Sequence, residues 1–346
     1  MQYRKLGTSD LQVPTVIFGA WAIGGWLWGG TDDKNAVAAM QRALDLGVNC
    51  IDTAAIYGMG HSEKLVGRAI KGRPRDSVII ATKCGLRWEG VEPKEDSFET
   101  VDNSGRAIRV IKHLAADSIA YECEQSLRRL GTDYIDLYQC HWPDVSTPIE
   151  ETMGALLELR DQGKIRAIGV SNFDADQMAD CLRYAPLASD QPRYGLLSRG
   201  VEDSILPFCR RHNVGVVCYS PLEHGILTGK VPAERTFPDD DLRSKLPWYQ
   251  PQNRSRVNAA LEEIRPIAES HNATLAQITV AWVIAQPGVT AALVGARRPE
   301  QVEENVGAAD VELSADELAA IRATFEALGD PLPSEKSFKG IAQRKG

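Results

Sequence analysis

A regular alternation of short apolar segments with longer helical patterns constrains the fold of this chain more than any other feature. Eight segments have the composition of buried β-strands: Val16–Gly19, Asn49–Asp52, Val78–Lys83, Ile135–His141, Ala167–Ser171, Ala188–Gln191, Gly215–Tyr219 and Ala291–Val294. Because strands that alternate with helices form right-handed βαβ units, this order predicts a parallel sheet. Eight such units favour a closed (β/α)8 TIM barrel over an open doubly wound sheet.

Helical patterns with ordinary start and stop signals lie between and after these segments. Asp33–Leu46 has apolar residues at helical spacing and is followed by Gly47, a residue that commonly ends helices. The other expected helices are Ser62–Ile70, Asp117–Leu130, Pro148–Asp161, Asp174–Tyr184, Val201–His212, Asn253–His271, Thr274–Gln286 and Ser314–Leu328. No shift of composition divides the chain, so we expect a single domain over residues 1–346.

Four segments fall outside the alternation. Residues 1–13 are expected to form a hairpin over the bottom of the barrel, and residues 330–346 a tail. The loops after the third and seventh strands, Cys84–His113 and Pro221–Gln252, are unusually long. Long ordered loops in compact domains usually serve as lids or binding loops, and a floppy insertion is the alternative.

Composition excludes several classes of function. The net charge of -8 argues against nucleic acid as a main partner, because a phosphate-binding face needs a surplus of Lys and Arg. No apolar stretch is long enough to span a bilayer, and the start of the chain lacks the apolar core of a secretory signal. The seven cysteines include no Cys-x-x-Cys pair and lie partly in apolar segments, as is typical of a reducing compartment. We therefore expect a soluble, cytoplasmic protein.

Polar residues stand where successive predicted strands end. In a barrel of this kind, catalytic residues gather at the carboxyl ends of the strands. Six consecutive strands end in such residues: Asp52, Lys83, His141, Ser171 with Asn172, Gln191 and Tyr219. An acid, a base and an imidazole in this series indicate chemistry rather than packing. A purely structural ion pair between Asp52 and Lys83 is the alternative, although such pairs contribute little to stability.

Tyr57 lies five residues after Asp52, on the loop that leaves the second strand. A phenol beside an ammonium group is a candidate general acid, and its ordinary pKa is about 10. A cation roughly 4 Å away contributes about 4 kcal/mol at an effective dielectric near 20, so we expect Lys83 to lower the pKa of the phenol. Asp52 would hold Lys83 in its charged form, and His141 would orient the substrate carbonyl. The alternative for Tyr57 is an aromatic lid that packs on Trp28 or Trp142.

Six stretches together resemble the aldo-keto reductases over nearly the whole chain. They read NCIDTAAIYGMGHSEKLVGRAI, IIATKCG, DYIDLYQCHWPD, IRAIGVSNF, CYSPLEHGILTGK and LVGARRPEQVEENV. The segments GGWLWGGTD and GARRPEQVEEN are similar to the bacterial branch that also resembles potassium-channel β subunits. This resemblance implies a catalytic tetrad of Asp52, Tyr57, Lys83 and His141, in which Tyr57 donates the proton during carbonyl reduction.

The same resemblance implies a binding site for a nicotinamide cofactor. Ser171, Asn172 and Gln191 would hold the carboxamide, which suits amide side chains because they both donate and accept hydrogen bonds. Tyr219 would stack on the ring. The segment after it would wrap the pyrophosphate through Ser220, Pro221, Leu222, Gly225, Leu227, Gly229 and Lys230. Glu304 and Asn305 would hold the adenine.

The residues expected near the adenosine 2′-phosphate depart from the family pattern. Gly295 and Gln301 stand where NADPH-dependent members often have Lys and Arg. Arg297 and Arg298 lie next to these positions, and guanidinium groups bind phosphate well. Two solvated arginines at the start of a helix are the alternative. We predict NADPH as the cofactor, with NADH as the other candidate, and no metal ion, because no clustered Cys/His spacing is present.

Five tryptophans fall in segments expected at the barrel mouth: Trp21, Trp26, Trp28, Trp88 and Trp142. Indoles present faces to the C–H groups of a sugar and an N–H to its hydroxyls, so Trp21, Trp28 and Trp142 are candidate substrate residues. Core packing is the alternative for each. The expected substrate is a small, sugar-like carbonyl compound, with further contacts from the charged segment Arg87–Arg109. An NAD-dependent polyol dehydrogenase and a nucleotide-binding regulatory subunit remain alternatives, and a homo-oligomer is compatible with all three.

Overall fold

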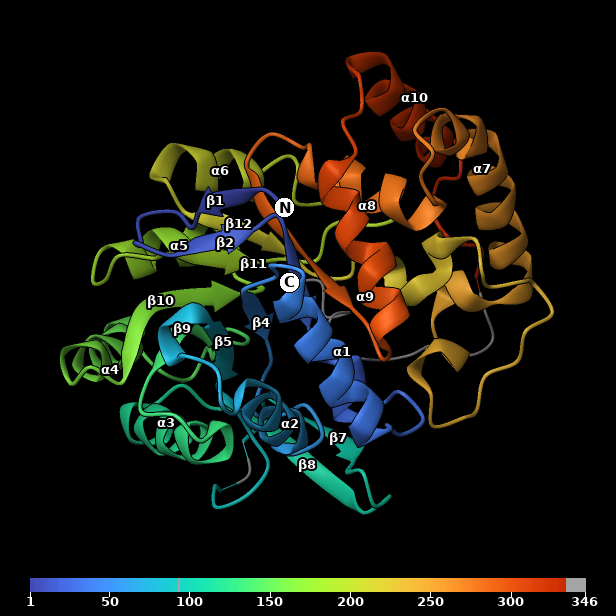
Figure 1. Ribbon diagram of the computed structural model, residues 1–346. Helices are drawn as coiled ribbons and strands as arrows, with labels where there is room; N and C mark the ends of the chain where they lie inside the picture. The colour runs from blue at the N-terminus through green and yellow to red at the C-terminus, as the bar shows by residue number, and fades with distance from the viewer. Residues whose placement is uncertain (93, 334–346) are drawn as a thin grey trace.

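A computed structural model shows a closed barrel of eight parallel strands with helices around it (Figure 1). It describes residues 1–92 and 94–333. The barrel strands are, in order around the ring, β3 (Val16–Gly19), β4 (Cys50–Asp52), β5 (Ile79–Cys84), β9 (Ile135–Cys140), β10 (Ile165–Ser171), β11 (Ser189–Gln191), β12 (Gly215–Cys218) and β13 (Val289–Gly295). The expected (β/α)8 barrel is confirmed, and each predicted strand is present within one or two residues of its expected bounds.

The helices on the outside of the barrel follow the start and stop signals of the sequence. They are α1 (Asp33–Asp45), α2 (His61–Ile70), α3 (Ala116–Leu130), α4 (Ile149–Asp161), α5 (Ala175–Leu182), α6 (Ile205–His212), α7 (Pro251–Ser270), α8 (Leu275–Ile284), α9 (Pro299–Val306) and α10 (Ala315–Glu326). Asp174 and Thr274 start α5 and α8 with reciprocal capping boxes, which satisfy exposed backbone N–H groups. The predicted start of α6 at Val201 was wrong, because residues 201–204 form turns before it.

The N-terminal hairpin closes the bottom of the barrel, as expected. Strands β1 (Tyr3–Lys5) and β2 (Gln12–Pro14) pair antiparallel. Leu6, Leu11 and Val13 then pack against inward-facing residues of the barrel strands. The tail was predicted over residues 330–346, and its part from 334 onward lies outside the described residues.

The two long loops contain local structure that the sequence analysis left unassigned. The segment after β5 is not an open loop but an antiparallel sheet of β6 (Leu86–Arg87), β8 (Ala107–Lys112) and β7 (Ser97–Val101). Apolar side chains of this sheet pack on the barrel mouth, which explains why it is ordered. The segment after β12 contains the 3-10 turns η3 (Glu223–Thr228), η4 (Leu242–Ser244) and η5 (Pro247–Tyr249).

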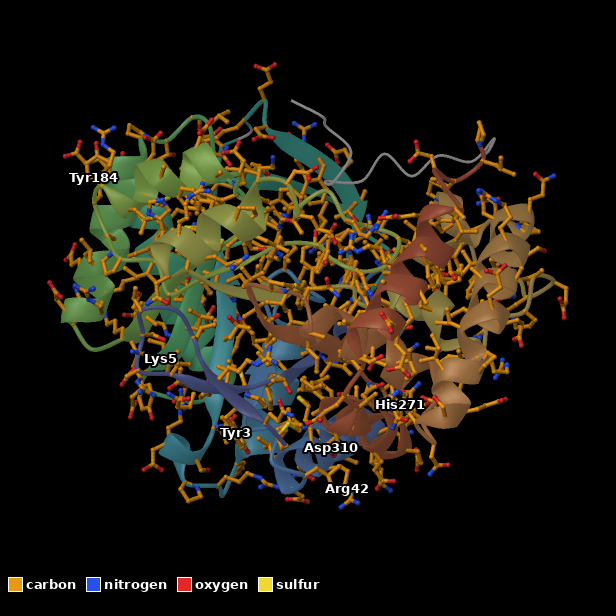
Figure 2. All side chains as sticks on the ribbon, turned by 90° about the horizontal axis from the view of Figure 1, so that it is seen from above. Tyr3, Lys5, Arg42, Tyr184, His271 and Asp310 are labelled. Atoms are coloured by element: carbon orange, nitrogen blue, oxygen red, sulfur yellow. The ribbon has the colours of Figure 1, made fainter. Side chains whose placement is uncertain are left out.

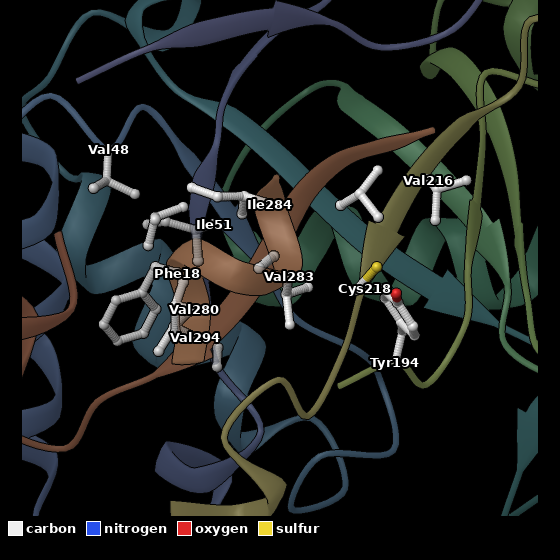
Figure 3. Close-up of a cluster of buried hydrophobic side chains, with 14 of the residues drawn as sticks. Phe18, Val48, Ile51, Tyr194, Val216, Cys218, Val280, Val283, Ile284 and Val294 are labelled. Carbon is white, nitrogen blue, oxygen red and sulfur yellow. The ribbon is translucent and has the colours of Figure 1, made fainter. Parts of the chain in front are cut away.

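The main hydrophobic core lies between the strands and the helices. Outward-facing side chains of the strands, among them Phe18, Ile51 and Val294, meet Val280 and Val283 of α8 (Figure 3). Every residue of α8 except Gln277 is buried, so this helix accounts for the longest apolar stretch of the sequence. Within the described part of the chain, no helix is both long and apolar enough to cross a membrane.

Charged side chains cover the outer helices and link them in pairs (Figure 2). Arg42 of α1 donates to Glu303 of α9 at 2.8 Å, and His271 after α7 lies 2.9 Å from Glu317 of α10. Because these pairs are exposed, each contributes little to the free energy of unfolding. The rigidity that positions the active site therefore comes from the closed sheet and its core.

Candidate active site

A buried ion pair forms the centre of the site. Lys83 Nζ donates to Asp52 Oδ1 at 2.6 Å and to the Thr53 carbonyl at 2.9 Å. It also lies 3.4 Å from the Tyr57 hydroxyl. Asp52 and Lys83 end neighbouring strands β4 and β5, so the parallel register brings them together where the strands meet the mouth. The structure thus brings three members of the predicted tetrad into hydrogen-bond contact.

Asp52 is bound on its other side by two amide groups. Its Oδ2 accepts from Gln191 Nε2 at 2.8 Å and from Gln139 Nε2 at 3.2 Å. The sequence analysis missed Gln139. The available signal was its place two residues before His141, because residues i and i+2 of a strand share one face. With both oxygens occupied, Asp52 is fixed in position and fixes Lys83 in turn.

The expected effect of Lys83 on the pKa of Tyr57 was wrong. Burial of the phenol, reinforced by the negative charge of Asp52, raises the pKa of Tyr57 well above its ordinary value. Burial also lowers the pKa of Lys83, against the opposing effect of Asp52. Desolvation penalises every charged form in this pocket, and that penalty exceeds the attraction we assigned to the ammonium group. The phenol is therefore a protonated donor at neutral pH.

His141 completes the tetrad at the end of β9. Its ring centroid lies 5.7 Å from that of Tyr57, with the two rings almost perpendicular. Burial and the nearby charge of Lys83 lower the pKa of His141 well below its ordinary value. A neutral imidazole can donate one hydrogen bond without adding a charge, so the pair can hold a carbonyl oxygen and supply a proton to it.

The residues assigned to the carboxamide form one connected group. Ser171 Oγ donates to the Gln191 carbonyl at 2.8 Å, and Asn172 Nδ2 donates to the His141 carbonyl at 3.0 Å. Tyr219 Oη donates to Asn172 Oδ1 at 2.9 Å. Asn172 has a left-handed backbone with φ of 62°, a conformation that Asn tolerates better than most residues. Amide, hydroxyl and aromatic groups thus meet beside the tetrad in a set that fits a nicotinamide ring and its carboxamide.

The segment predicted to wrap the pyrophosphate turns sharply at Gly225 and Gly229. Both glycines have positive φ, and a Cβ atom on Gly225 would meet no atom within 4 Å. A Cβ atom on Gly229 would approach Leu275 at 2.7 Å, so this glycine is needed for packing. Leu227 is fully buried in the core, and Pro221 is buried too, whereas Ser220 and Leu222 are half-buried. Gly225 is half-buried, and Gly229 and Lys230 are the exposed part of this segment.

The two predicted adenine residues contact different parts of the chain, Glu304 the segment that follows β12 and Asn305 the end of β13. Glu304 accepts from Lys230 Nζ at 2.6 Å, which joins α9 to the end of the pyrophosphate segment. Asn305 Nδ2 donates to the Gly295 carbonyl at 3.2 Å. These contacts place the residues expected around the adenosine on one continuous surface.

The two arginines near the expected 2′-phosphate differ in their surroundings. Arg297 donates from its guanidinium group to the Trp28 and Gly30 carbonyls, and its backbone N–H donates to Gln301 Oε1 at 2.8 Å. It therefore holds the loop after β3. Arg298 is exposed and precedes the first turn of α9. Of the two, Arg298 has its guanidinium group available to an anion.

Four of the five predicted mouth tryptophans, Trp21, Trp26, Trp88 and Trp142, gather in one cluster with Tyr57, and Trp28 joins it through Trp21. Trp21 stacks on Tyr57 with ring centroids 6.1 Å apart, and Trp28 meets Trp21 edge-on at 5.6 Å. Trp142 packs in the same cluster and lies 5.6 Å from the ammonium group of Lys112. Trp21 thus lies next to Tyr57, with Trp28 and Trp142 farther along the same group of rings, and a contact of these three residues with substrate stays a prediction.

Sequence reasoning missed three further residues at the mouth. His224 packs on Trp21 and Trp28, and Glu223 forms a buried ion pair with Arg193. The signal was the pair Glu-His within the otherwise apolar stretch PLEHGIL. A separate anchor comes from Asn103 between β7 and β8, whose Nδ2 donates to the Gly24 carbonyl at 2.8 Å.

Comparison with known proteins agrees with the class that this barrel and its tetrad define, an oxidoreductase of the aldo-keto type. The model of the Aldo/keto reductase family matches residues 15–326. The aldo-keto reductase YhdN of Bacillus subtilis (strain 168) is 41% identical over 306 residues, which cover 88% of this chain and 87% of that protein. The NADH-specific methylglyoxal reductase of Escherichia coli (strain K12) is 39% identical over 333 residues, which cover 95% and 99%.

A solved structure gives the same result. The glycerol dehydrogenase AKR11B4 from Gluconobacter oxydans superimposes with a TM-score of 0.83 at 41% identity, and the match covers 98% of each chain. The present chain therefore belongs to the aldo/keto reductase family. Members of this family use nicotinamide cofactors in carbonyl chemistry, in agreement with the cluster formed by Asn172, Gln191 and Tyr219.

Proposed function

We propose that this protein reduces a sugar-like aldehyde or ketone to the alcohol with NADPH. The observation that carries the proposal is the position of Tyr57, a protonated phenol in contact with Lys83 and next to His141. Tryptophan side chains pack around it. A bound nicotinamide supplies the hydride that the carbonyl carbon accepts. The carbonyl oxygen then needs one proton, and Tyr57 is the group placed to give it.

Each member of the tetrad has a separate task in this proposal. Tyr57 Oη transfers its proton to the developing alkoxide, and Lys83 Nζ stabilises the phenolate that remains. Asp52 keeps the ammonium group in place through its 2.6 Å hydrogen bond. The neutral imidazole of His141 donates to the carbonyl oxygen and so fixes its position before the proton moves.

The preference for NADPH rests on Arg298. Its exposed guanidinium group at the start of α9 is suited to a 2′-phosphate, because it offers two parallel donors at the positive end of the helix dipole. Arg297 supports the site indirectly by holding the loop that carries Trp28. One relative is NADH-specific by name, so the two nucleotides must be compared directly for this chain.

Oxidation of a polyol by the same residues is the second candidate. The observation in its favour is the 41% identity with a protein described as a glycerol dehydrogenase. In that direction the phenolate of Tyr57 removes the proton from the alcohol, as microscopic reversibility requires. Because the pKa of Tyr57 is raised, this direction becomes faster at alkaline pH.

The proposal is tested by following the absorbance of NADPH and NADH with a panel of aldehydes, ketones and sugars. We expect turnover with hydroxylated aldehydes and tighter binding of NADPH than of NADH in a fluorescence titration. Binding of nucleotide without turnover of any carbonyl compound would contradict an enzymatic function. Turnover only with an alcohol and the oxidised cofactor would favour the dehydrogenase.

A further inference from the structure

Three rings from two loops meet at the barrel mouth beside the proton donor. Trp21 and Trp28 come from the loop after β3, and His224 comes from η3 after β12. Their ring centroids are 5.6 Å apart for the two indoles, 5.7 Å for Trp21 and His224, and 5.9 Å for Trp28 and His224. We call these residues the mouth triad. Because Trp21 also stacks on Tyr57, the triad adjoins the position of the reacting carbonyl.

Each ring of the mouth triad has a buried nitrogen that finds no hydrogen-bond partner among residues 1–92 and 94–333. These atoms are Trp21 Nε1, Trp28 Nε1 and His224 Nδ1. An unpaired buried polar atom costs about 1–3 kcal/mol, and native proteins contain few of them. Two other indoles are paired, because Trp26 Nε1 donates to a Thr100 hydroxyl at 3.1 Å and Trp282 Nε1 donates to a backbone carbonyl. Three unpaired nitrogens on adjoining rings therefore indicate a missing polar partner.

The surrounding chain holds His224 in a conformation that it would not adopt freely. Glu223 and His224 have successive left-handed backbones, with φ of 45° and 58°. This conformation costs about 1–2 kcal/mol for a residue with a Cβ atom. The ion pair of Glu223 with Arg193 and a 2.7 Å hydrogen bond from Tyr249 Oη to the His224 carbonyl maintain it. Strain of this kind is concentrated at functional sites.

The loop that carries Trp28 is also held by hydrogen bonds. The backbone N–H of Leu242 donates to the Leu27 carbonyl at 3.0 Å, and Arg297 donates to the Trp28 carbonyl. Arg243 lies over the Trp28 ring at 5.1 Å. The indoles are therefore fixed from both long loops, and their polar atoms are presented in a defined arrangement.

The chemistry of the triad suits hydroxyl groups without charge. Indole nitrogens only donate hydrogen bonds, whereas a neutral imidazole donates from one nitrogen and accepts at the other. Burial lowers the pKa of His224 to about 4, so its ring is neutral at neutral pH. The nearest guanidinium groups are already paired, Arg193 with Glu223 and Arg243 with Asp241. Arg297, also close to Trp28, directs its guanidinium group at the Trp28 and Gly30 carbonyls. The rings of the triad themselves thus offer only uncharged polar atoms to a ligand.

We infer that the mouth triad is a hydroxyl-binding subsite next to the reacting carbonyl, and that it selects uncharged α-hydroxy carbonyl compounds. The two indole N–H groups donate to the hydroxyl oxygen atoms, and His224 exchanges a hydrogen bond with the same hydroxyls. This inference rests on the proposed function, because it assigns a substrate to the same active site. A site built for a hydroxyl rejects the analogue without it, because its own polar groups then stay unpaired.

Glyceraldehyde and propanal test the inference, because they have the same carbon chain with and without hydroxyls. The measured quantity is the ratio of their kcat/KM values, each corrected for the free aldehyde. We expect the unmodified protein to favour glyceraldehyde by about 100-fold or more. His224→Leu and Trp28→Phe should each reduce this ratio about tenfold, the expected loss for one hydrogen bond to an uncharged group. Trp248→Phe makes the same exchange in the main core and should leave the ratio within about twofold.

The possible outcomes separate this inference from the proposed function. If His224→Leu and Trp28→Phe leave the ratio as it is, or lower both kcat/KM values equally, the mouth triad only packs and the inference is wrong. If the unmodified protein reduces neither aldehyde with either nucleotide, the proposed function fails as well. A thermal unfolding midpoint for each variant identifies a misfolded His224→Leu, in which case Trp28→Phe decides, since it retains an aromatic ring.

Discussion

The hydrogen-bond network around Asp52, inside the barrel, and the mouth triad contain polar groups in opposite conditions. In the interior, both oxygens of Asp52 are hydrogen-bonded, to Lys83 on the adjacent strand β5 and to Gln191 on β11, across the barrel. At the mouth, Trp21, Trp28 and His224 have buried nitrogens without partners. The interior network is complete in the protein alone. In the functions proposed above, the Asp52 network sets the reaction, and the mouth triad selects the substrate that completes its hydrogen bonds.

This difference follows from the elements that carry each region. The interior residues stand at the ends of strands whose register is fixed by the ring of backbone hydrogen bonds. The mouth residues stand on loops, where left-handed residues such as Ser220 and His224 determine the path of the chain. Substitutions in the interior should therefore change the chemical step, and substitutions at the mouth should change selectivity.

The largest effect is expected for Tyr57→Phe, which removes one oxygen from the interior network and retains the ring. Loss of a positioned general acid typically costs about 10²–10⁴ in rate. The loss should appear in kcat as well as in kcat/KM, because the proton is transferred only in the transition state. Steady-state kinetics with a parallel nucleotide titration measure both effects. A kcat within tenfold of that of the unmodified protein would show that Tyr57 is not the general acid. A large loss of nucleotide binding would show that Tyr57 has a structural role.

The second prediction concerns Glu122 of α3, which contacts the end of β5 from outside the barrel. Its buried carboxylate accepts the backbone N–H of Gly85, two residues after Lys83. Burial is the main cause that raises the pKa of Glu122 to about 7. The native state therefore holds a proton that the unfolded chain releases near its ordinary pKa of about 4.5, and stability falls as the pH rises from about 4.5 to 7.

The isosteric variant Glu122→Gln separates this contribution from the rest of the pH dependence. The amide keeps an oxygen for Gly85 but does not titrate, so the fall in stability over this range should shrink by no more than about 3 kcal/mol. Urea unfolding at several pH values measures it. Parallel pH profiles for the two proteins would show that Glu122 does not bind this proton.

The third prediction concerns the contact between the mouth loop and the turn that carries Tyr57. A Cβ atom on Gly24 would lie 2.9 Å from the backbone of Tyr57, so Gly24→Ala must displace one of the two segments. A displacement of about 1 Å can cost on the order of 10²-fold in rate, and we expect a 10- to 100-fold loss of kcat/KM. Gly154→Ala in α4 is the matched control, because a Cβ atom there meets no atom within 4 Å. Equal activity of the two variants would refute the contact.

The smallest effect is expected at the edge of the cofactor site. Arg298→Ala should weaken NADPH about tenfold, the usual size for one exposed charge-assisted contact, and leave NADH within about twofold. Fluorescence titrations with both nucleotides measure the two affinities. Arg297→Ala should differ, because this residue holds the Trp28 carbonyl and its loss should change substrate selectivity as well. Equal affinities of the unmodified protein for NADPH and NADH would overturn the assignment.

The barrel and the tetrad could be predicted from the sequence because both depend on local pattern. An apolar segment that ends in Asp52 or Lys83 identifies a strand and places its last residue at the mouth. The sheet formed by β6, β7 and β8 was also within reach, since Asp102–Gly105 has the composition of a tight turn. The direction in which the pKa of Tyr57 shifts could not be predicted, because it depends on how completely the assembled fold excludes water.

His224 illustrates a different limit. Its position depends on two successive left-handed residues and on the ion pair of Glu223 with Arg193, which lies 30 residues before Glu223 in the chain. Neither propensity nor periodicity predicts a left-handed conformation for Glu or His. The role of such a residue becomes visible only when its neighbours in space are known.

The hydrogen bonds of Asp52 have a consequence for how the molecule comes apart. One carboxylate joins β4, which carries it, to β5 through Lys83, to β9 through Gln139 and to β11 through Gln191. No one of these strands can detach without leaving a buried charge or amide unpaired. The active site and half of the ring should thus open as one cooperative unit, and their amide hydrogens should exchange with solvent at a common, slow rate.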